Sequence, residues 1–502
     1  MSRVRVAGLA CLSLLSACNL APAYRRPTAA IPPSFKEAPG WRSAAPADAI
    51  AKGEWWRLFD DPTLDALEAR VAVNNQNVAA AAAAYAQARA TVREVRASLF
   101  PQIDLSGSAT RAGSFGRGTT TIIGGTGSNT GGTTTGTGTG VGTGGTGTGT
   151  TTTVTNGSGS RRYSLSVGAS WEPDLWGRIG SGLREQRALA EASLGDLNNA
   201  TLSAQGELAL DYVQLRGLEA QKLVLDATVA AYAKALTITT NRYNAGVVAK
   251  VDVLQAQTQL TSARANAADL VRQRSAFEHA IAVLIGENPS SYALPEQPWR
   301  RLVPDVPATL PAALLERRPD IAGAERRVAA ANSAIGIERA AFFPTLSFSS
   351  DVGLNASSLG SLFSVASSIW SLGVQGALTL LDFGARSARV AEARAAYEQA
   401  VASYRQTVLT AFQQVEDELA AVQVLAYVGD QRMIAAQTAT RVEQLTQNQY
   451  LAGQIVYTDV ITAQATALQA RQAETQAIVD RQVAAISLIQ AIGGSWPAAG
   501  AP

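Results

Sequence analysis

One residue near the start of the chain is suited to covalent modification rather than to catalysis. Leu15-Ser16-Ala17-Cys18 matches the bacterial lipobox, whose cysteine is acylated once the residues before it have been removed. Arg3 and Arg5 precede an apolar run and then small residues, which is the layout of a secretory signal peptide. The sequence therefore predicts a signal peptide over residues 1–17 and a lipid such as palmitate on Cys18. The alternative is an ordinary signal peptide with a chance cysteine near its end.

Composition describes an exported protein with few reactive groups. Cys11 would leave with the signal peptide, so the mature chain keeps one cysteine and cannot form an internal disulfide. Loss of Arg3 and Arg5 would leave 40 basic residues against 40 acidic ones, and a neutral chain does not predict a nucleic-acid partner. Asn19, where an aspartate would favour retention, favours sorting of the lipoprotein to the outer membrane.

The residues that could perform catalysis are few, although a glycoside hydrolase needs only two carboxylic acids and composition alone does not exclude one. His279 is the single histidine and stands in a helical pattern, so no Ser/His/Asp arrangement or metal cluster can be built around it. Glu416, Asp417 and Glu418 are adjacent acids in a stretch typical of a solvated helix face. We expect no enzyme activity, no metal and no cofactor beyond the covalent lipid on Cys18.

An internal repeat organises the chain. Tyr243-Asn-Ala-Gly246 and Asp252-Val-Leu-Gln-Ala-Gln257 recur 207 residues later as Tyr450-Leu-Ala-Gly453 and Asp459-Val-Ile-Thr-Ala-Gln464. Such a repeat predicts two copies of one structural unit.

The repeat also sets the expected domain boundaries. The first copy is longer by about 35 residues, which places a Gly/Thr-rich insertion in it at about residues 113–160, and we expect that segment to be a solvated loop. The expected parts of the chain are a lipidated N-terminal segment (18–60), a first repeat (61–300), a second repeat (301–494) and a C-terminal tail (495–502).

Four segments alternate apolar and polar residues with a period of two, as strands with one polar face do. They lie at residues 102–109, 164–171, 345–354 and 370–380. Each has about 8–11 residues, close to the roughly 9–11 that cross a bilayer when tilted. After the signal peptide, no run approaches the roughly 18–20 apolar residues of a membrane-spanning helix, so we expect any crossing to be made by strands.

The remaining segments have helical patterns of unusual length. Residues 181–244 and 386–451 contain no proline, and each would extend about 95–100 Å as one helix. Residues 64–98 and 251–285 are about half as long, so two shorter helices could lie end to end beside a long one. We therefore expect a barrel of long helices attached to a β-section.

Strand number predicts that one chain is incomplete. Four strands leave two open edges, and unpaired backbone groups in hydrocarbon cost several kcal/mol each. Eight strands from a dimer would enclose about enough space for side chains alone, whereas twelve from a trimer leave a passage. This argument favours a trimer over a dimer and leaves higher oligomers open.

Several motifs resemble the TolC-like outer-membrane factor family, in particular its lipidated branch. The resemblance extends from Cys18 to about Gly494, and its most specific stretches are Trp55-Trp-Arg-Leu-Phe-Asp-Asp-Pro-Thr-Leu64, Trp171-Glu-Pro-Asp-Leu-Trp-Gly-Arg178, Arg317-Arg-Pro-Asp-Ile321 and Ala340-Ala-Phe-Phe-Pro-Thr-Leu346. It implies a mixed α/β membrane protein: a homotrimeric, 12-stranded transmembrane β-barrel continuous with a long periplasmic α-helical barrel, plus a small equatorial region.

The resemblance also implies a function and partners. It implies an outer-membrane, lipid-anchored channel of a tripartite efflux or secretion system, which passively conducts drugs and other small toxic compounds. The partners would be a periplasmic adaptor (membrane fusion protein), an RND-type inner-membrane transporter and outer-membrane lipid. The alternative is a non-conducting periplasmic coiled-coil lipoprotein, which would leave the duplicated amphipathic strands unexplained.

Family roles transfer to five residues of the repeat. Gly246 and Gly453 match the tips of two helical hairpins that contact the adaptor, although a turn that needs positive φ also explains a glycine. Tyr450 and Asp252 match residues that hold the periplasmic gate shut, and Asp459 matches a carboxylate ring at the constriction. The alternative is that both aspartates only cap the returning helices.

Two positions near the second tip depart from the family pattern. Ile455 stands where some relatives carry a gate arginine, and Thr462 stands where many carry a further gate aspartate. The contact of that arginine must therefore be missing, and the number of carboxylate rings is left open.

Overall fold

The structure is a computed structural model that describes residues 20–28, 35–37, 54–112, 120–121, 152–153, 160–304 and 318–494. The predicted signal peptide, Cys18, the tail 495–502 and most of the Gly/Thr-rich segment lie outside the described residues. The chain forms two compact units. One comprises Met1–Arg96, Leu175–Phe342 and Leu381–Pro502, and the other comprises Ala97–Asp174 and Phe343–Leu380.

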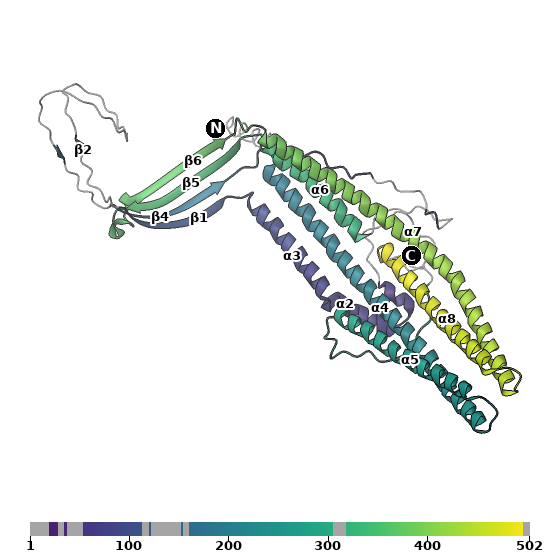
Figure 1. Cartoon of the computed structure of the whole chain (residues 1–502). Helices are drawn as coiled ribbons and strands as arrows, with labels where there is room; N and C mark the ends of the chain where they lie inside the picture. Colours follow the sequence, from purple (N-terminus) through teal and green to yellow (C-terminus); the bar gives the residue numbers. More distant parts are fainter. Residues whose placement is uncertain are drawn as a thin grey trace, which may run out of the picture. The chain divides into compact units, whose positions relative to one another are not determined.

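The first unit is built from two helical hairpins of equal dimensions (Figure 1). In the first hairpin the 67-residue helix α4 (Arg178–Asn244) turns into the 35-residue helix α5 (Lys250–Leu284). In the second hairpin α7 (Ala385–Leu451) and α8 (Tyr457–Ala491) have the same two lengths. These helices confirm the predicted segments to within a few residues, because no proline interrupts either long run.

Each half of the chain contains a further, shorter helical segment, and the one in the first half differs from the prediction. Instead of a single helix over residues 64–98, the chain forms α2 (Pro62–Asn74) and α3 (Gln76–Ala97). Asn75 separates them, because its side-chain oxygen accepts hydrogen bonds from the backbone N–H groups of Asn77 (2.9 Å) and Val78 (3.1 Å) and so caps α3. Its amide also donates to the Leu284 carbonyl at 2.8 Å. In the second half α6 (Pro319–Ala340) precedes the strands.

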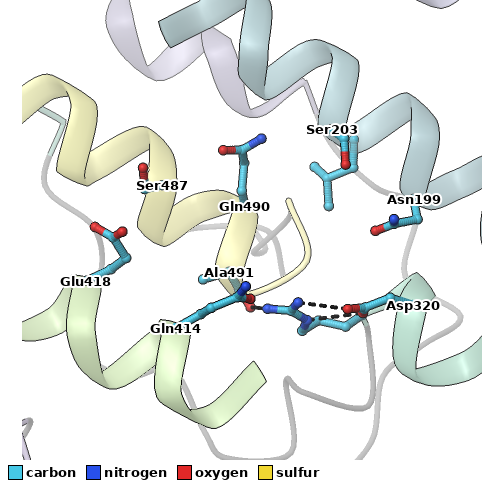
Figure 2. A pocket seen from close by; sticks show the side chains of 10 residues that line it. Asn199, Ser203, Asp320, Gln414, Glu418, Ser487, Gln490 and Ala491 are labelled. Atoms are coloured by element: carbon cyan, nitrogen blue, oxygen red, sulfur yellow. Dashed lines mark hydrogen bonds and ion pairs between the residues drawn. The ribbon is translucent and has the colours of Figure 1, made fainter. Parts of the chain in front are cut away.

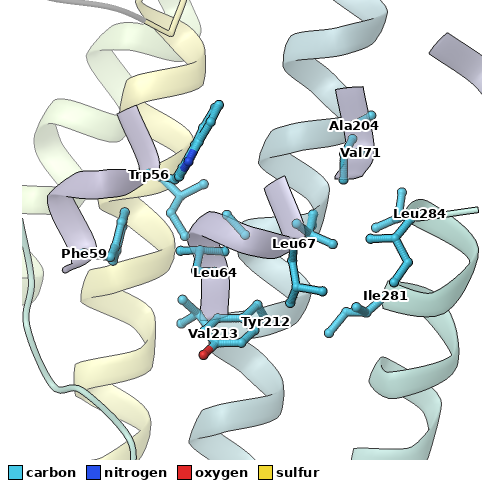
Figure 3. Packing of buried hydrophobic residues seen from close by; sticks show 14 of the residues in the cluster. Trp56, Phe59, Leu64, Leu67, Val71, Ala204, Tyr212, Val213, Ile281 and Leu284 are labelled. Carbon is cyan, nitrogen blue, oxygen red and sulfur yellow. The ribbon is translucent and has the colours of Figure 1, made fainter. Parts of the chain in front are cut away.

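The core of this unit explains the Trp-rich motif. Trp55, Trp56 and Phe59 of the 3-10 helix η1 (Trp55–Phe59) belong to a buried cluster that also includes residues of α2, α4, α5 and α8 (Figure 3). Asp61 begins α2 by accepting from the backbone N–H of Thr63, and its other oxygen accepts from the Tyr212 hydroxyl at 2.7 Å. The motif therefore fastens the start of α2 to the middle of α4.

The described N-terminal residues lie along α6 and α7. Asn332 donates to the Pro22 carbonyl at 2.9 Å, and the Tyr24 hydroxyl bonds to the Glu325 carboxylate. Further along, the Glu416 carboxylate accepts from the backbone N–H groups of Lys36 and Glu37. Glu416, which the sequence placed on a solvated face, thus holds this segment.

Gly336 makes room for the N-terminal segment, which yields a prediction. A Cβ there would lie 2.6 Å from the Ala21 Cβ, whereas at Gly182 the nearest atom would be 3.8 Å away. Overpacking of this kind costs about 1–3 kcal/mol, so Gly336→Ala should displace residues 20–28. We expect trypsin to cleave after Arg25 about tenfold faster, with Gly182→Ala as the control. Equal cleavage rates in the two variants would contradict this packing.

The second unit contains a four-stranded antiparallel sheet in the order β1-β4-β5-β6. Its strands are β1 (Gln102–Ala112), β4 (Ser160–Trp171), β5 (Thr345–Ala356) and β6 (Ser368–Ala377), with the 3-10 turns η3 (Leu359–Ser361) and η4 (Val365–Ser367) between the last two. All four predicted strands are present. The sheet leaves β1 and β6 as edges.

Register confirms that the two faces of the sheet differ. Leu105, Val167, Val352 and Trp370 are paired across the four strands and are all exposed. On the other face the hydroxyls of Ser106 and Ser166 lie 2.9 Å apart, as expected for cross-strand polar pairs. One face is therefore apolar and the other polar.

The last strand ends earlier than its pattern predicted. The alternation continues to Leu380, but β6 ends at Ala377. Asp382 then accepts hydrogen bonds from the backbone N–H groups of Gly384 and Arg386 at 3.1 Å each, which begins α7. Local capping of the long helix thus prevails over the alternating pattern.

The Gly/Thr-rich segment, expected to be a loop, contains one short strand pairing. Within the Gly/Thr-rich segment the structure describes a two-stranded pairing of β2 (Thr120–Thr121) with β3 (Thr152–Thr153).

The expectation that no later segment could span a membrane as a helix was too strict, because α4 is long and apolar enough by length and composition. Counting uninterrupted apolar residues missed it. Contacts of α4 with α5, α6 and α8 give those apolar side chains a packing role.

Candidate functional site

The turns of the two hairpins repeat the same backbone geometry. Gly246 and Gly453 each have φ of +75°, a conformation that favours glycine. Gly246 donates its N–H to the Tyr243 carbonyl at 2.9 Å, and Gly453 donates to the Tyr450 carbonyl at 3.0 Å. A Cβ would meet nothing within 4 Å at either position, so backbone conformation rather than lack of space requires the glycine. Both residues are exposed, as a contact surface requires.

The two aspartates of the repeat lie one turn into the returning helices. Asp252 and Asp459 are in the first turns of α5 and α8, where a carboxylate interacts favourably with the helix dipole. The N-cap positions themselves are Ala249 and Val456, and neither makes a side-chain cap bond. Asp252 is half-buried and Asp459 is exposed.

Tyr450 belongs to a small apolar cluster, here called the tip cluster, that joins the two hairpins. Its buried members come from α5, α7 and α8 and are Ala256, Tyr450, Tyr457 and Val460. The rings of Tyr450 and Tyr457 lie 5.2 Å apart at 51°. Burial, with the neighbouring Tyr450, raises the pKa of Tyr457 to about 12.

The predicted link between Tyr450 and Asp252 is not made within one chain. Tyr450 is only 4% exposed, and its hydroxyl has no hydrogen-bond partner among the described residues. Ile455 packs against the tip cluster and makes an apolar contact there.

A groove of about 770 Å³ runs between α7 and α8 beside the tip cluster. Asp459 and Thr462 line it together with small and apolar residues of α7 such as Ile434, Ala435 and Val442. Ile434 and Val442 are about half exposed, at 51% and 48%. A single chain thus leaves an apolar helix face uncovered next to the exposed carboxylate.

A second cavity, of about 410 Å³, lies where α4, α6, α7 and α8 meet (Figure 2). Arg318 donates to both oxygens of Asp320, at 2.8 and 3.1 Å, and to the Ala491 carbonyl at 2.8 Å (Figure 2). This arginine therefore ties the start of α6 to the last turn of α8, where carbonyls lack helical partners. The Arg-Arg-Pro-Asp motif has a structural explanation here.

Residues considered for catalysis are not brought together. His279 is exposed on α5. Burial, with nearby Asp417, raises the pKa of Glu418, which lines the second cavity. Among the described residues there is no group of three or more His, Cys, Asp or Glu side chains that could hold a metal ion.

Sequence reasoning missed one residue near the tips. Arg242 in the last turn of α4 donates to the Tyr450 carbonyl at 3.1 Å, and its guanidinium lies 4.7 Å from the centre of the Tyr450 ring. The sequence signal that was available is a basic residue in the last turn of a helix, a common position that does not identify its partner.

Comparisons with known proteins agree with this architecture. A sequence model of the outer membrane efflux protein family matches residues 68–287 and 310–494. The probable efflux pump outer membrane protein TtgC of Pseudomonas putida is 28% identical over 487 residues, covering 96% of this chain and 94% of that protein. The cation efflux system protein CusC of Escherichia coli is 26% identical over 492 residues, covering 97% of this chain and 98% of that protein.

A solved structure, that of the outer-membrane channel OprN, is similar in fold. It covers 95% of this chain and 100% of that chain at 27% identity, with a TM-score of 0.80. The family model spans both halves of the repeat and most of the chain. The chain belongs to the outer membrane efflux protein family.

Proposed function

We propose that this protein is the outer-membrane channel of a tripartite efflux system. The observation that carries the proposal is the match of both repeats to outer membrane efflux proteins, together with a sheet whose exposed face is apolar. The full-length relatives include efflux pump outer membrane proteins. No energy source need reside in this chain if a separate transporter drives the export.

The proposed assembly is a homotrimer with a 12-stranded barrel and a periplasmic helical barrel. Two features support it. The edges β1 and β6 of the four-stranded sheet need partners, and three copies would leave a passage that two would not. The uncovered face of α7 and α8 supplies an apolar surface that a neighbouring copy would bury.

The remaining parts of the proposal concern the lipid anchor, the hairpin tips and the gate. Cys18 would carry the lipid that anchors the chain to the outer membrane. Gly246 and Gly453 would contact a periplasmic adaptor at the hairpin tips, with an RND-type transporter in the inner membrane. Tyr450, Asp252 and Asp459 would form the resting gate.

Conductance of the purified protein in planar bilayers tests the channel. We expect a low resting conductance in the wild type, and an increase of about tenfold in Asp252→Ala and Tyr450→Phe, equivalent to one charge-assisted hydrogen bond of about 1.4 kcal/mol. To reach a carboxylate of a neighbouring copy the Tyr450 hydroxyl would have to leave its buried position, since it is buried and has no partner within the described part of one chain.

The matched control for the gate is Asp269→Ala. Asp269 is an exposed carboxylate on α5, paired with Arg272 at 2.7 Å and distant in sequence from the tip. It should leave conductance unchanged. Absence of conductance in the wild type and in both gate variants would refute the channel and favour a non-conducting structural lipoprotein.

A further inference from the structure

The clearest direct tie between the ends of the two long helices is made by Arg242. Its guanidinium donates from Nη1 to the Tyr450 carbonyl at 3.1 Å and covers the Tyr450 ring at 4.7 Å. One side chain of α4 thus contacts both the backbone and the ring of a residue on α7. A planar guanidinium can make both contacts at once, because it stacks through its face and donates through its edge.

The corresponding residues of the two repeats do not both make this contact. Arg242 lies 207 residues before Gln449, which is its counterpart in the second repeat. The counterpart of Tyr450 is Tyr243, which is 40% exposed, whereas Tyr450 is 4% exposed. Glutamine offers neither the charge nor the planar fork, so the equivalent contact cannot form on the other side. Of the two equivalent contacts that the repeat would allow, the described residues therefore make the one from Arg242.

The three helices of the tip cluster leave several polar atoms without partners. Buried side-chain oxygens with no hydrogen-bond partner in the described residues occur on all three helices that contribute buried residues to the tip cluster: Gln255 of α5, Gln447 and Tyr450 of α7, and Gln464 of α8. Unpaired buried polar atoms disfavour the packed arrangement. The closed tip is therefore held by few contacts against an internal cost, which makes each holding contact important.

We propose that Arg242 is the positioning residue that keeps the resting entrance closed from within one chain, by clamping the end of α4 onto Tyr450. This inference rests on the proposed channel function. It differs from the gate residues above because it needs no neighbouring copy: ring, carbonyl and guanidinium all belong to the same chain. Opening of the entrance then requires the end of α4 to leave the Tyr450 ring.

The test compares resting conductance of Arg242 variants in planar bilayers. Arg242→Ala should raise the open fraction about tenfold, equivalent to about 1.4 kcal/mol. Arg242→Gln, which copies the residue of the second repeat, should be as leaky as alanine. Arg242→Lys should recover part of the closure, since an ammonium retains attraction to the ring but loses the stacked fork.

The matched control is Arg441→Ala. Arg441 is an exposed arginine of α7 that donates to the Gln444 side chain at 3.4 Å, and it does not belong to the tip cluster. This variant removes the same charge from the same unit and should conduct like the wild type. Equal leakiness of Arg441→Ala would mean that net charge, rather than the contact with Tyr450, sets the resting state.

A double-mutant cycle separates a clamp from a general weakening of the fold. In a Tyr450→Leu background, Arg242→Ala should raise conductance by less than it does in the wild type, because the ring contact is already lost and only the bond to the backbone carbonyl remains. Melting temperatures of the Arg242 single variants should match that of Arg441→Ala. Independent, multiplying effects of the two substitutions would overturn the proposal.

The outcomes also distinguish this inference from the channel itself. If Asp252→Ala raises conductance and Arg242→Ala does not, the clamp is wrong and the channel stands. If no variant conducts, the channel proposal fails first.

Discussion

Replacing Glu219 with alanine is expected to lower the free energy of unfolding of the helical unit by about 3–5 kcal/mol, the range for breaking a buried ion pair. Its carboxylate accepts from Arg216 Nη1 at 2.7 Å and from Arg274 Nε at 2.8 Å. The Arg216 side chain is 1% exposed, so the substitution would leave a buried cation with the Pro295 carbonyl and the Tyr212 ring as its partners but no counter-charge from Glu219.

The loss should extend to the segment that links the two repeats. Arg274 also donates to the Leu294 carbonyl, and Glu278 accepts from the Leu294 N–H at 2.6 Å. These contacts hold residues 294–295 against α4 and α5, and they depend on the position of Arg274. Hydrogen exchange of this segment should therefore become faster in Glu219→Ala.

Thermal unfolding followed by helical circular dichroism checks this result. The matched control is Asp269→Ala, which breaks an ion pair whose side chains are 71% and 50% exposed. Exposed pairs contribute about 0–1 kcal/mol, so the control should melt close to the wild type. A Glu219→Ala protein that melts with the control would show that the buried network contributes little.

The second large effect concerns Glu68, a carboxylic acid with no compensating partner. Its side chain is fully buried in α2, and neither oxygen has a hydrogen-bond partner among the described residues. Burial, with nearby Asp65, raises the pKa of Glu68 well above its ordinary value of 4.5. Glu68→Gln removes the ionisable group and should stabilise the protein at pH 8 by about 1–3 kcal/mol.

The direction of the pH dependence follows from proton linkage. A carboxyl whose pKa is higher in the folded than in the unfolded state binds more protons when folded, so stability falls as pH rises between the two values. Burial, with Glu207, also raises the pKa of Asp211 from 3.8 to about 6, so its contribution is lost between those values. The contribution of Glu68 is lost from about pH 4.5 upward.

Melting temperatures at pH 5 and pH 8 test the assignment. The wild type should melt lower at pH 8, and Glu68→Gln should reduce that difference, leaving the part due to Asp211 and to other carboxyls with a raised pKa such as Glu418. Glu94→Gln on the exposed surface of α3 is the control. A pH dependence unchanged by Glu68→Gln would mean that the carboxyl finds a partner in solution.

Local sequence patterns predicted most of the fold. Proline-free runs marked α4 and α7, and alternation marked all four strands, because each pattern depends only on neighbouring residues. The break at Asn75 was missed because a single asparagine becomes decisive only when its amide finds the distant Leu284 carbonyl. The end of β6 was missed because Asp382 accepts hydrogen bonds that begin α7. An alternating strand pattern contains no information about where a helix begins.

The candidate site was only partly predictable, for the same reason. Positive φ at Gly246 and Gly453 follows from turn chemistry and was predicted. Burial of Tyr450 and its contact with Arg242 join positions 208 residues apart, and no local pattern specifies such a pair. The repeat showed which residues correspond, but it did not show which member of each pair makes contacts.

The two edges of the four-stranded sheet have a genetic consequence. Edges β1 and β6 differ in sequence, so in the proposed ring each junction would join unlike strands and be heterologous. The even strand count keeps neighbours antiparallel all the way round. A harmful substitution on β1 should then be suppressed by changes on β6 of the adjacent copy. When two defective alleles, one altered at each edge, are co-expressed, only a minority of the junctions should join two unaltered edges.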